Sequence, residues 1–577
     1  MRLAAVGQQR YTHRPDLRFD PERGASPRRP DILADASIPG SQANGDASDA
    51  RDERGVLLLQ AGGHRLAKEC SDWGDTPIRQ ILWEQEAAHY PDSTTEILYP
   101  DQALADYTRG MTTDFDAPPT SAVVDIPAVV GAVRKTFASG RTRSIEWRKR
   151  QLTALERLIV ENEAAIAEAL DQDLGRQPFE AWLADIASTA AEARAAAKNI
   201  GKWTRRKHRL LEMAQLPGRA WIEYEPFGTV LVIGAWNFPF ALTLGPAVGA
   251  IAAGNAVVLK PSEVAPASSA LMAELVPKYL DGDAIVVVEG DGSVSQELIS
   301  QGFDKLCFTG GTEIGRKVYE AAAAQLTPVI LELGGKSPVI VAADADIEVA
   351  ARRIAWTKLM NSGQICIAPD YVLADASIRD ELVDALRANV DKFEAGNVAG
   401  KPIVNQRHFD RLVSSLAVTK GDVVLGGGSD ADALTIQPTV VLDLDLDEPL
   451  MQQEIFGPIL PIVTVQSLDE AIDFVNARPK PLAAYLFTKS KSVRERVIKQ
   501  VTAGGMVVNH LLFHFSTNKL PFGGVGPSGM GAYHGRFGFE EFSHRKSVLT
   551  KPTRPDITAM IYPPYTEKAS KLARKLF

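Results

Sequence analysis

Cys366, in the stretch NSGQICIAPDY at residues 361–371, stands where a cysteine could do covalent chemistry. It follows a glycine and a glutamine among small and apolar residues, and neither Cys70 nor Cys307 stands at CxxC or metal-ligand spacing to it. A thiol without a sulfur partner is either a packed residue or a nucleophile, and a thiolate attacks carbonyl carbon readily. The rest of the sequence must decide between these two readings.

Two polar side chains close to apolar, strand-like runs could serve such a nucleophile. Glu332 stands in VILEL, just before two glycines, where a carboxylate could meet a ligand; a surface glutamate at a strand end is the simpler alternative. Asn237 follows the run TVLVIG. Its amide could cap a turn before Pro239, or it could donate to an oxygen that becomes charged during a reaction.

Two further motifs could bind a nucleotide. In KPSE, Lys260 and Glu263 are three residues apart after a strand-like run and could hold ribose hydroxyls, or they could form a solvated ion pair. FTGGTEIG, residues 308–315, indicates a strand, Gly310 and Gly311, and then a helix. Glycines let a pyrophosphate approach a helix N-terminus closely, but the GxGxxG spacing is absent, so this motif alone is a weak signal.

The elements that position these residues follow from the apolar pattern. Strand-like runs alternate with helical stretches, which predicts a parallel sheet with helical crossovers; the runs are TVLVIGA, NAVVLKP, AIVVVEG, KLCFTGG and VILELGG. A second α/β region follows, with the strands SPVIVAADAD, DYVLADASI, LPIVTV and LAAYLFT. Upstream, apolar residues three and four apart in WRKRQLTALERLIVENEAAIAEAL and FEAWLADIASTAAEARAAAKNI predict two helices before the first sheet.

Size and charge limit the classes of function. The 577 residues suffice for two or three domains, and three cysteines favour a reducing compartment. A formal net charge of −9 disfavours a nucleic-acid partner, and no apolar run is long enough for a membrane span. The N-terminus has neither a signal-peptide nor a transit-peptide pattern, so we expect a cytoplasmic protein.

Residues 1–110 differ in composition from the rest of the chain. They are rich in Pro, Gly, Asp, Arg and Ser, with few periodic apolar residues, which predicts a disordered extension. Met111 then opens MTTDFDAPPTSAVV, which is typical of the leader of a folded domain. We expect the extension to be dispensable for folding.

Taken in this order, the motifs resemble those of the aldehyde dehydrogenase superfamily. The blocks are AWNFP, KPSE, FTGGTEIG, LELGGKSP, NSGQICIAPDY, EIFGP and LPFGGVGPSGMGAYHG, and the resemblance spans residues 120–565. CIAPDYV and GMGAYHGRFGFEEFSH look most like the class 3 branch, which acts on apolar aliphatic and aromatic aldehydes. The resemblance implies NAD(P)-dependent oxidation of such aldehydes to carboxylic acids through a cysteine thiohemiacetal and a thioester.

The resemblance also implies a fold and domain boundaries. It implies an α/β fold with a Rossmann-type cofactor domain at 111–334, interrupted by an oligomerisation excursion near 213–228. An α/β catalytic domain would follow at 335–525, and 526–577 would hold an oligomerisation strand and tail. We expect a homodimer, in which the excursion strand RAWIEYEPFG offers an edge to a partner and a late strand near SHRKSVLTK takes part.

Residue roles can be assigned by the same resemblance. Cys366 would be the nucleophile, Glu332 the general base, and Asn237 with the backbone N–H of Cys366 the oxyanion hole. The cofactor would be bound by Trp236, Lys260, Glu263, Gly311, Glu454 and Phe456. Gly311 stands where the family commonly has a serine, so a hydroxyl contact to phosphate is missing. Glu263 beside a ribose 2′-hydroxyl would repel a 2′-phosphate, which favours NAD, although NADP is possible.

Two other functions fit parts of the sequence. An acylating enzyme would pass the thioester to coenzyme A, but a hydrolytic base such as Glu332 would waste the acyl group. A catalytically silent binding protein would be expected to lose the nucleophile or the base, and both are present. His510 and His514 are four residues apart but lack a nearby acid, so we expect no metal site.

Overall fold

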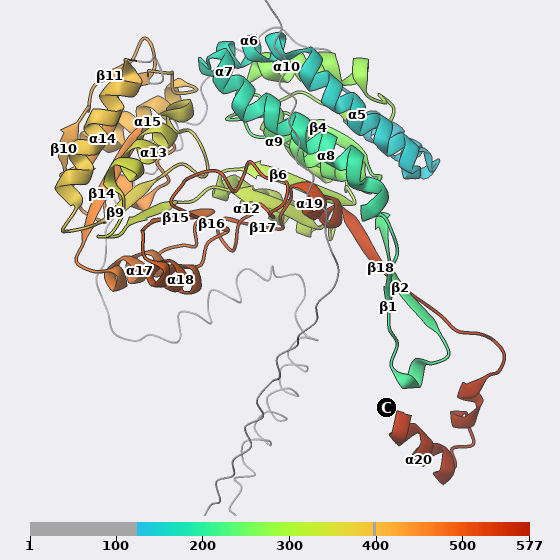
Figure 1. The fold of residues 1–577 in the computed structure, drawn as a ribbon. Coiled ribbons are helices and arrows are strands. Elements are labelled where there is room, and N and C mark those ends of the chain that lie inside the picture. Colours follow the sequence, from blue (N-terminus) through green and yellow to red (C-terminus); the bar gives the residue numbers. More distant parts are fainter. Residues whose placement is uncertain (1–123, 396–399, 577) are drawn as a thin grey trace, which may run out of the picture. The chain divides into compact units, whose positions relative to one another are not determined.

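The computed structural model describes residues 124–395 and 400–576, and two parallel sheets organise this part of the chain (Figure 1). Our predictions for residues 1–110 lie outside the described residues. They stay predictions, as does the expected cytoplasmic location.

Helices precede the first sheet, as predicted, but each of the two predicted helices is divided. The first stretch forms α5 (Ile145–Glu161) and α6 (Glu163–Leu174), after the leading helix α4 (Ile126–Ala138). They separate at Asn162, whose side-chain nitrogen donates to the carbonyl oxygen of Leu158 at 2.8 Å and so competes with the helical bonding pattern. The second stretch forms α7 (Pro178–Ala181), a π-helical turn at Trp182–Ile186, and α8 (Ala187–Trp203).

The first sheet has the strand order β17-β7-β6-β3-β4-β5. Its strands are β3 (Thr229–Ile233), β4 (Ala256–Lys260), β5 (Ile285–Val287), β6 (Lys305–Gly310), β7 (Val329–Leu333) and β17 (Gly529–Met530). All pairs are parallel except β17 with β7. The strand order reverses between β3 and β6, and in open α/β sheets ligands bind at the carboxyl ends of the strands at such a point.

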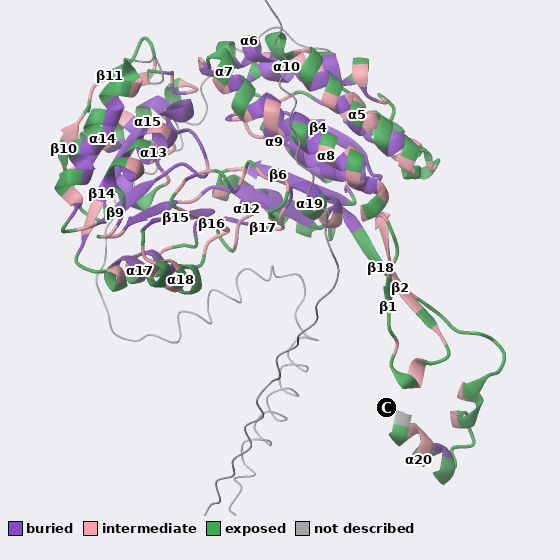
Figure 2. Ribbon diagram, in the orientation of Figure 1, coloured by how far each residue is buried: buried purple, intermediate pink, exposed green. Residues whose placement is uncertain are grey.

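Helices cover both faces of this sheet. One apolar cluster joins alternate residues of β3 and β4 to α5, α6 and α8 and to the crossover helices α9 (Pro239–Ala253) and α10 (Pro266–Tyr279). The opposite cluster joins the remaining strand residues to α4, α11 (Gly292–Ser300) and α12 (Thr312–Ala323). Figure 2 shows α9 and the strands in the colour of buried residues, and every residue of α9 is buried. Helix α9, which begins two residues after Asn237, is therefore a fixed support for that residue.

The second sheet has the strand order β10-β13-β14-β9-β8-β15-β16, with only β10 antiparallel to its neighbour. Its strands are β8 (Pro338–Val341), β9 (Tyr371–Asp375), β10 (Asp422–Leu425), β13 (Thr439–Leu442), β14 (Ile459–Val465), β15 (Ala483–Phe487) and β16 (Gly505–Val508). The helices around it are α13 (Ile347–Leu359), α14 (Arg379–Glu394), α15 (Gln406–Ala417), α16 (Pro449–Gln452), α17 (Leu468–Asn476) and α18 (Lys491–Gln500). The short pair β11 (Ser429–Asp430) and β12 (Thr435–Ile436) lies outside this sheet.

A third sheet joins early and late parts of the chain. It contains β1 (Lys207–Arg209), β2 (Arg219–Pro226) and β18 (Ser543–Thr550), and Figure 1 shows β2 and β18 side by side. Strand β2 pairs with β1 on one side and β18 on the other. The expectation that β2 offers a free edge is therefore wrong, because the late strand covers it within the same chain. After β18 come a short 3-10 helix (Ile557–Ile561) and α20 (Glu567–Leu576).

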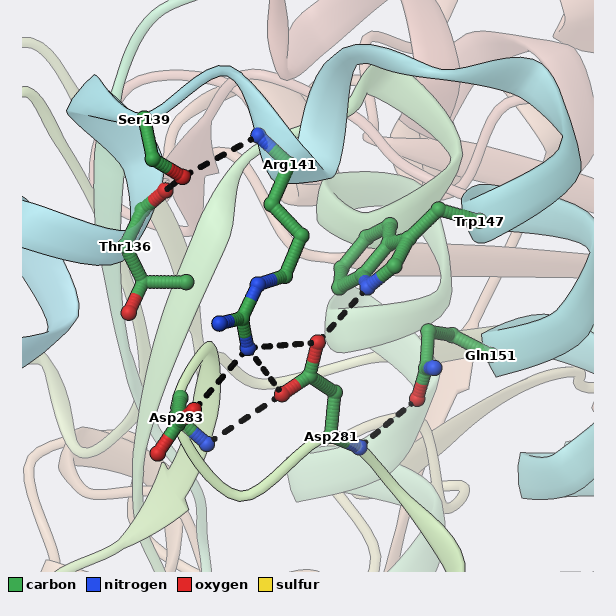
Figure 3. A network of polar contacts seen from close by, with 7 residues as sticks. All are labelled: Thr136, Ser139, Arg141, Trp147, Gln151, Asp281 and Asp283. Atoms are coloured by element: carbon green, nitrogen blue, oxygen red, sulfur yellow. Dashed lines mark hydrogen bonds and ion pairs between the residues drawn. The ribbon is translucent and has the colours of Figure 1, made fainter.

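A polar network fastens the start of α5 to the turn before β5 (Figure 3). One guanidinium nitrogen of Arg141 lies 3.1 Å from Asp281 and 2.9 Å from Asp283. The indole N–H of Trp147 donates to Asp281 at 2.8 Å, and the side chain of Gln151 accepts from the Asp281 backbone N–H at 2.9 Å. Exposed ion pairs contribute little stability, so the half-buried bonds of Trp147 and Gln151 matter more.

None of the helices in the described part of the chain has the length and apolar character that a bilayer crossing requires.

Candidate active site

Cys366 lies in the connection from α13 to β9, after an unusual left-handed turn. Asn361, Ser362 and Gly363 have φ values of 50°, 51° and 71°. Left-handed backbone is costly for residues with a Cβ, so surrounding contacts must enforce it. Glu180 accepts from the backbone N–H of Asn361 at 2.7 Å, and the hydroxyl of Ser362 donates to the carbonyl of Lys401 at 2.7 Å. The backbone that presents Cys366 is therefore fixed from outside the loop.

The side chain of Cys366 opens into an apolar cavity of about 210 Å³. Its walls come from four regions: the π-helical turn with the first residues of α8, the start of α9 with the preceding Phe238, the α13 end with its following loop, and the segment from Leu512 to Ser516. Leu183, Phe238, Trp356, Met360 and Phe515 are among the lining residues. A nucleophile at the end of such a cavity suits an apolar substrate with one polar reacting group.

Burial and negative charge hold Cys366 in its thiol form. Desolvation raises the pKa of the thiol, and the carboxyl groups of Glu454 and Glu332 raise it further because a thiolate beside them would be repelled. Burial and these carboxyl groups thus favour the thiol over the reactive thiolate in the ligand-free site.

Glu332 lies on β7 with 3% of its surface exposed, which excludes the reading as a surface glutamate. Within the described residues, neither of its carboxyl oxygens has a hydrogen-bond partner. Burial, with a smaller effect of Glu541, raises the pKa of the Glu332 carboxyl well above its usual range. Buried polar atoms are almost always paired, so this group is kept ready for a ligand or water.

Asn237 follows β3 and reaches the backbone close to Cys366. It is 3% exposed, and its side-chain nitrogen donates to the carbonyl oxygen of Gln364 at 3.1 Å. Gln364 precedes Cys366 by two residues, so the structure brings the predicted oxyanion donor to the predicted nucleophile.

The predicted ribose-binding pair lies at the carboxyl end of β4. The ammonium of Lys260 lies 2.6 Å from a carboxyl oxygen of Glu263. Lys260 is 1% exposed, whereas Glu263 is exposed and can turn toward a ligand.

Gly311 is the N-cap of α12 at the carboxyl end of β6, next to the reversal of the strand order. A Cβ at Gly311 would meet no atom within 4 Å. The space beside this helix N-terminus is therefore open at Gly311, as the close approach of a pyrophosphate requires. A serine would also fit, so packing does not impose the glycine.

The other residues predicted to bind the cofactor, Trp236, Glu454 and Phe456, also come together. Trp236 and Phe456 pack edge to face with ring centroids 5.4 Å apart. The carboxyl of Glu454 lies directly over Gly334, where a Cβ would overlap with it. Burial and the charge of Asp370 raise the pKa of Glu454 to about 8. A carboxyl of raised pKa, a glycine cradle and an open helix N-terminus fit a dinucleotide, whose ribose hydroxyls and phosphates need such partners.

Three charged residues that were not predicted from the sequence fix the segment 450–455, which carries Glu454. The ammonium of Lys336 donates to the carbonyl oxygens of Leu450 and Gln453, each at 2.8 Å, and pairs with Asp370. Asp370 accepts from the backbone N–H of Ile455 at 2.9 Å, and Arg411 donates to the carbonyl of Ile455 at 2.7 Å. Lys336 and Asp370 lie inside the motifs LELGGKSP and CIAPDYV, and these motifs could have drawn attention to them in the sequence. Arg411 lies in no such motif.

Cys307 and His514 have buried surroundings. Cys307 is a fully buried residue of β6. His514 is 8% exposed and burial lowers its pKa to about 4. Across residues 124–395 and 400–576, no three His, Cys, Asp or Glu side chains are grouped closely enough to hold a metal ion.

Comparison with known proteins supports the resemblance. The sequence model of the aldehyde dehydrogenase family matches residues 112–548. Aldehyde dehydrogenase family 3 member I1, chloroplastic, of Arabidopsis thaliana is 45% identical over 78% of this chain and 82% of its own. The dimeric NADP-preferring aldehyde dehydrogenase of Mus musculus is 44% identical over 77% of this chain and 99% of its own.

Solved structures of aldehyde dehydrogenases have the same fold as this chain. The substrate-bound AldH of Staphylococcus aureus is 41% identical and superposes with a TM-score of 0.76, covering 79% of this chain and all of the other. An NAD-dependent aldehyde dehydrogenase of Sinorhizobium meliloti is 29% identical with a TM-score of 0.70, over 78% and 90% of the two chains. The predictions of the family, the class 3 branch and the α/β fold are confirmed. The chain belongs to the aldehyde dehydrogenase family and is an NAD(P)-dependent aldehyde dehydrogenase.

Proposed function

We propose that this enzyme oxidises apolar aldehydes to carboxylic acids, with Cys366 as nucleophile, Glu332 as general base and Asn237 in the oxyanion hole. The observation that carries the proposal is the position of Cys366 at an apolar cavity, with Asn237 bonded to the loop that carries it. The cavity walls select for hydrocarbon because they desolvate an aliphatic or aromatic chain at little polar cost.

In the first step, the Cys366 sulfur adds to the carbonyl carbon of the aldehyde. The C=O π electrons move to oxygen and give a tetrahedral thiohemiacetal with an oxyanion. The Asn237 side-chain amide and the backbone N–H of Cys366 donate to that oxygen, and each donor contributes about 3 kcal/mol in comparable sites. The left-handed turn at 361–363 fixes where the second donor points.

A bound nicotinamide supplies the hydride acceptor that turns the thiohemiacetal into a thioester. Glu332 then removes a proton from water as its oxygen attacks the thioester carbon. The C–S bond breaks, the carboxylic acid leaves, and Cys366 regains a proton. Burial raises the pKa of the Glu332 carboxyl, which makes its carboxylate a stronger base toward water.

Cofactor binding would act on both ionisable groups. In the ligand-free site, burial raises the pKa of the Cys366 thiol and of the Glu332 carboxyl and so disfavours both charged forms. A cationic nicotinamide ring beside them would favour the thiolate and the carboxylate by opposite charge. This coupling would keep the thiol unreactive until a cofactor is present.

We further propose that NAD is the preferred cofactor. Glu263, which pairs with Lys260 at 2.6 Å, is the proposed partner of the ribose 2′-hydroxyl, and its charge would repel a 2′-phosphate at that position. A murine relative is named as NADP-preferring, so the family accommodates both cofactors. Glu263→Ser should raise kcat/KM with NADP relative to NAD.

We also propose a homodimer. One relative is named as dimeric, and in the described part of the chain the outer edge of β18 has no neighbouring strand. An open edge of eight residues can pair with a second copy.

The decisive experiment measures NADH formed from an apolar aldehyde, such as a medium-chain alkanal, by the purified full chain without coenzyme A. Production of NADH and the corresponding acid is expected, and Cys366→Ala should abolish both. An absolute need for coenzyme A would instead identify an acylating enzyme.

A further inference from the structure

Arg176 is a fully buried arginine in the turn between α6 and α7, and no motif of the sequence includes it. The preceding Gly175 has φ 62° and ends α6, so the chain turns inward at this point. A charged side chain with no exposed surface must have partners for its donors, because an unpaired buried charge is costly.

The guanidinium of Arg176 donates to three separate segments. It forms an ion pair of 2.5 Å with Asp185, which is also fully buried. Its Nε donates to the side-chain oxygen of Asn361 at 3.0 Å, and one terminal nitrogen donates to the backbone carbonyl of Asn237. The guanidinium also lies 4.3 Å from the ring centre of Phe238.

Two of these segments carry the proposed oxyanion donors. Asn237 supplies one donor, and the turn at Asn361 leads to Cys366, which supplies the other. The side-chain nitrogen of Asn361 extends the link, since it donates to the carbonyl of Asn237 at 3.3 Å and to that of Gln364 at 3.1 Å. Arg176 thus lies at the junction of both loops.

Asp185 anchors this junction to the π-helical turn and to α9. One of its oxygens pairs with Arg176, and the other accepts from the backbone N–H of Ala241 at 2.8 Å in the first turn of α9. Phe238, the N-cap residue of α9, has no side-chain acceptor for the free N–H groups of the first turn. Asp185, from the π-helical turn, accepts from one of them instead. The π-helical turn therefore sets the position of Arg176. Leu183, another residue of this turn, lines the Cys366 cavity.

An arginine suits this place for geometric reasons. The guanidinium is a planar fork with five donors in fixed directions, whereas a lysine ammonium is a point charge on a flexible stem. Replacing a buried ion pair by apolar residues is often neutral or stabilising, so stability alone is a weak reason for this pair.

We infer that Arg176 is a positioning residue, which holds the backbone of Asn237 against the turn before Cys366 so that both oxyanion donors converge on one point. This inference rests on the proposed role of Asn237.

The test is a double-mutant cycle between Arg176→Lys and Asn237→Ala, read as the rate of the NADH burst in single-turnover experiments with a medium-chain alkanal. Arg176→Lys alone should slow the burst about 10- to 100-fold, the range expected for small misplacements of catalytic groups, with KM and NAD binding within twofold of the parent. In the Asn237→Ala background, the same change should have less than a threefold effect.

Arg148→Lys is the matched control. Arg148 is also a buried arginine, 6% exposed, and it donates to the carbonyls of Thr142, Arg143 and Ala252 instead of the loops at Cys366. The Arg148→Lys substitution should lower the melting temperature without slowing the NADH burst. Should Arg176→Lys fail to fold, Asp185→Asn weakens the same ion pair with an isosteric side chain and completes the cycle in its place.

The outcomes separate the role of Arg176 from that of Asn237. An unchanged burst in the Arg176 variant, or equal slowing in both backgrounds, would overturn the inference and leave the role of Asn237 intact. A normal burst in Asn237→Ala alone would overturn the proposed oxyanion hole, and the inference with it.

Discussion

The side-chain amide of Asn237 donates to the carbonyl oxygen of Gln364 at 3.1 Å, across 127 positions of sequence. In the ligand-free protein, this bond holds the proposed oxyanion donor beside the loop of Cys366. A substrate oxygen would take over a donor that is already aimed, so little reorganisation is needed when charge develops.

Asn237→Ala should slow the acylation step about 10²–10³-fold, because it removes one oxyanion donor. NADH burst rates measure this step directly. Alkylation of Cys366 by iodoacetamide serves as the control, since that reaction forms no oxyanion and should keep its rate. Equal losses in both reactions would mean that the substitution displaces the thiol instead.

Glu332→Gln should keep the burst and lose turnover. Glutamine preserves size but removes the base, so deacylation should slow about 10²–10⁴-fold. The burst should approach one NADH per active site, and intact-mass analysis should detect an acyl adduct that Cys366→Ala lacks. A variant that binds cofactor without a burst would show that Glu332 is needed to activate the thiol.

The same substitution should stabilise the folded protein at neutral pH. Folding raises the pKa of Glu332, so the folded state favours its protonated form. The free energy of unfolding therefore falls as pH rises above about 4.3, the pKa of a glutamate in the unfolded chain. The penalty grows by about 1.4 kcal/mol per pH unit up to the folded pKa. Glu332→Gln should therefore raise the melting temperature at pH 8 more than at pH 4.5, and a difference independent of pH would contradict the buried carboxyl.

Activity should rise with pH across the neutral range. Cys366 reacts as the thiolate, and its pKa is raised, first by burial and then by Glu454 and Glu332, so the acid limb of kcat/KM moves to higher pH. Glu454→Gln removes a carboxyl that becomes charged as pH rises through its pKa of about 8, and it should shift the upper part of that limb to lower pH, whereas Glu320→Gln, an exposed carboxyl on α12, should not. An identical limb in the Glu454 variant would exclude this electrostatic effect.

The cavity mouth should control chain-length preference. Phe513 lines the cavity and is 55% exposed, so Phe513→Ser should raise KM for long-chain aldehydes and leave propanal unaffected. Phe179, which is 71% exposed but not part of the lining, provides the matched control as Phe179→Ser. Comparable KM changes in both variants would argue for a general surface effect.

Much of the fold and site followed from local pattern. Two of the catalytic candidates, Asn237 and Glu332, stand at or near the end of a short apolar run, and a strand with its following turn is encoded within a few residues, as at β3 before Asn237 and β7 around Glu332. The prediction of a free edge on β2 was wrong because the late strand β18, although recognisable in the sequence, carries no local signal that it pairs with β2 of the same chain. Arg176 escaped notice for the same reason: its three acceptors belong to distant segments, and only the folded chain brings them together.

The pairing of β18 with β2 joins residues separated by roughly 300 positions, and β17 likewise completes the edge at β7 late in the chain. At 5–20 residues per second, a ribosome needs roughly 15–60 s to deliver β18 after β2 has emerged. During that time the nascent chain carries an uncovered strand with Trp221, Ile222 and Tyr224, which other nascent chains on the same message could pair with. The outer edge of β2 is therefore a site for pairing between nascent chains until β18 has been translated.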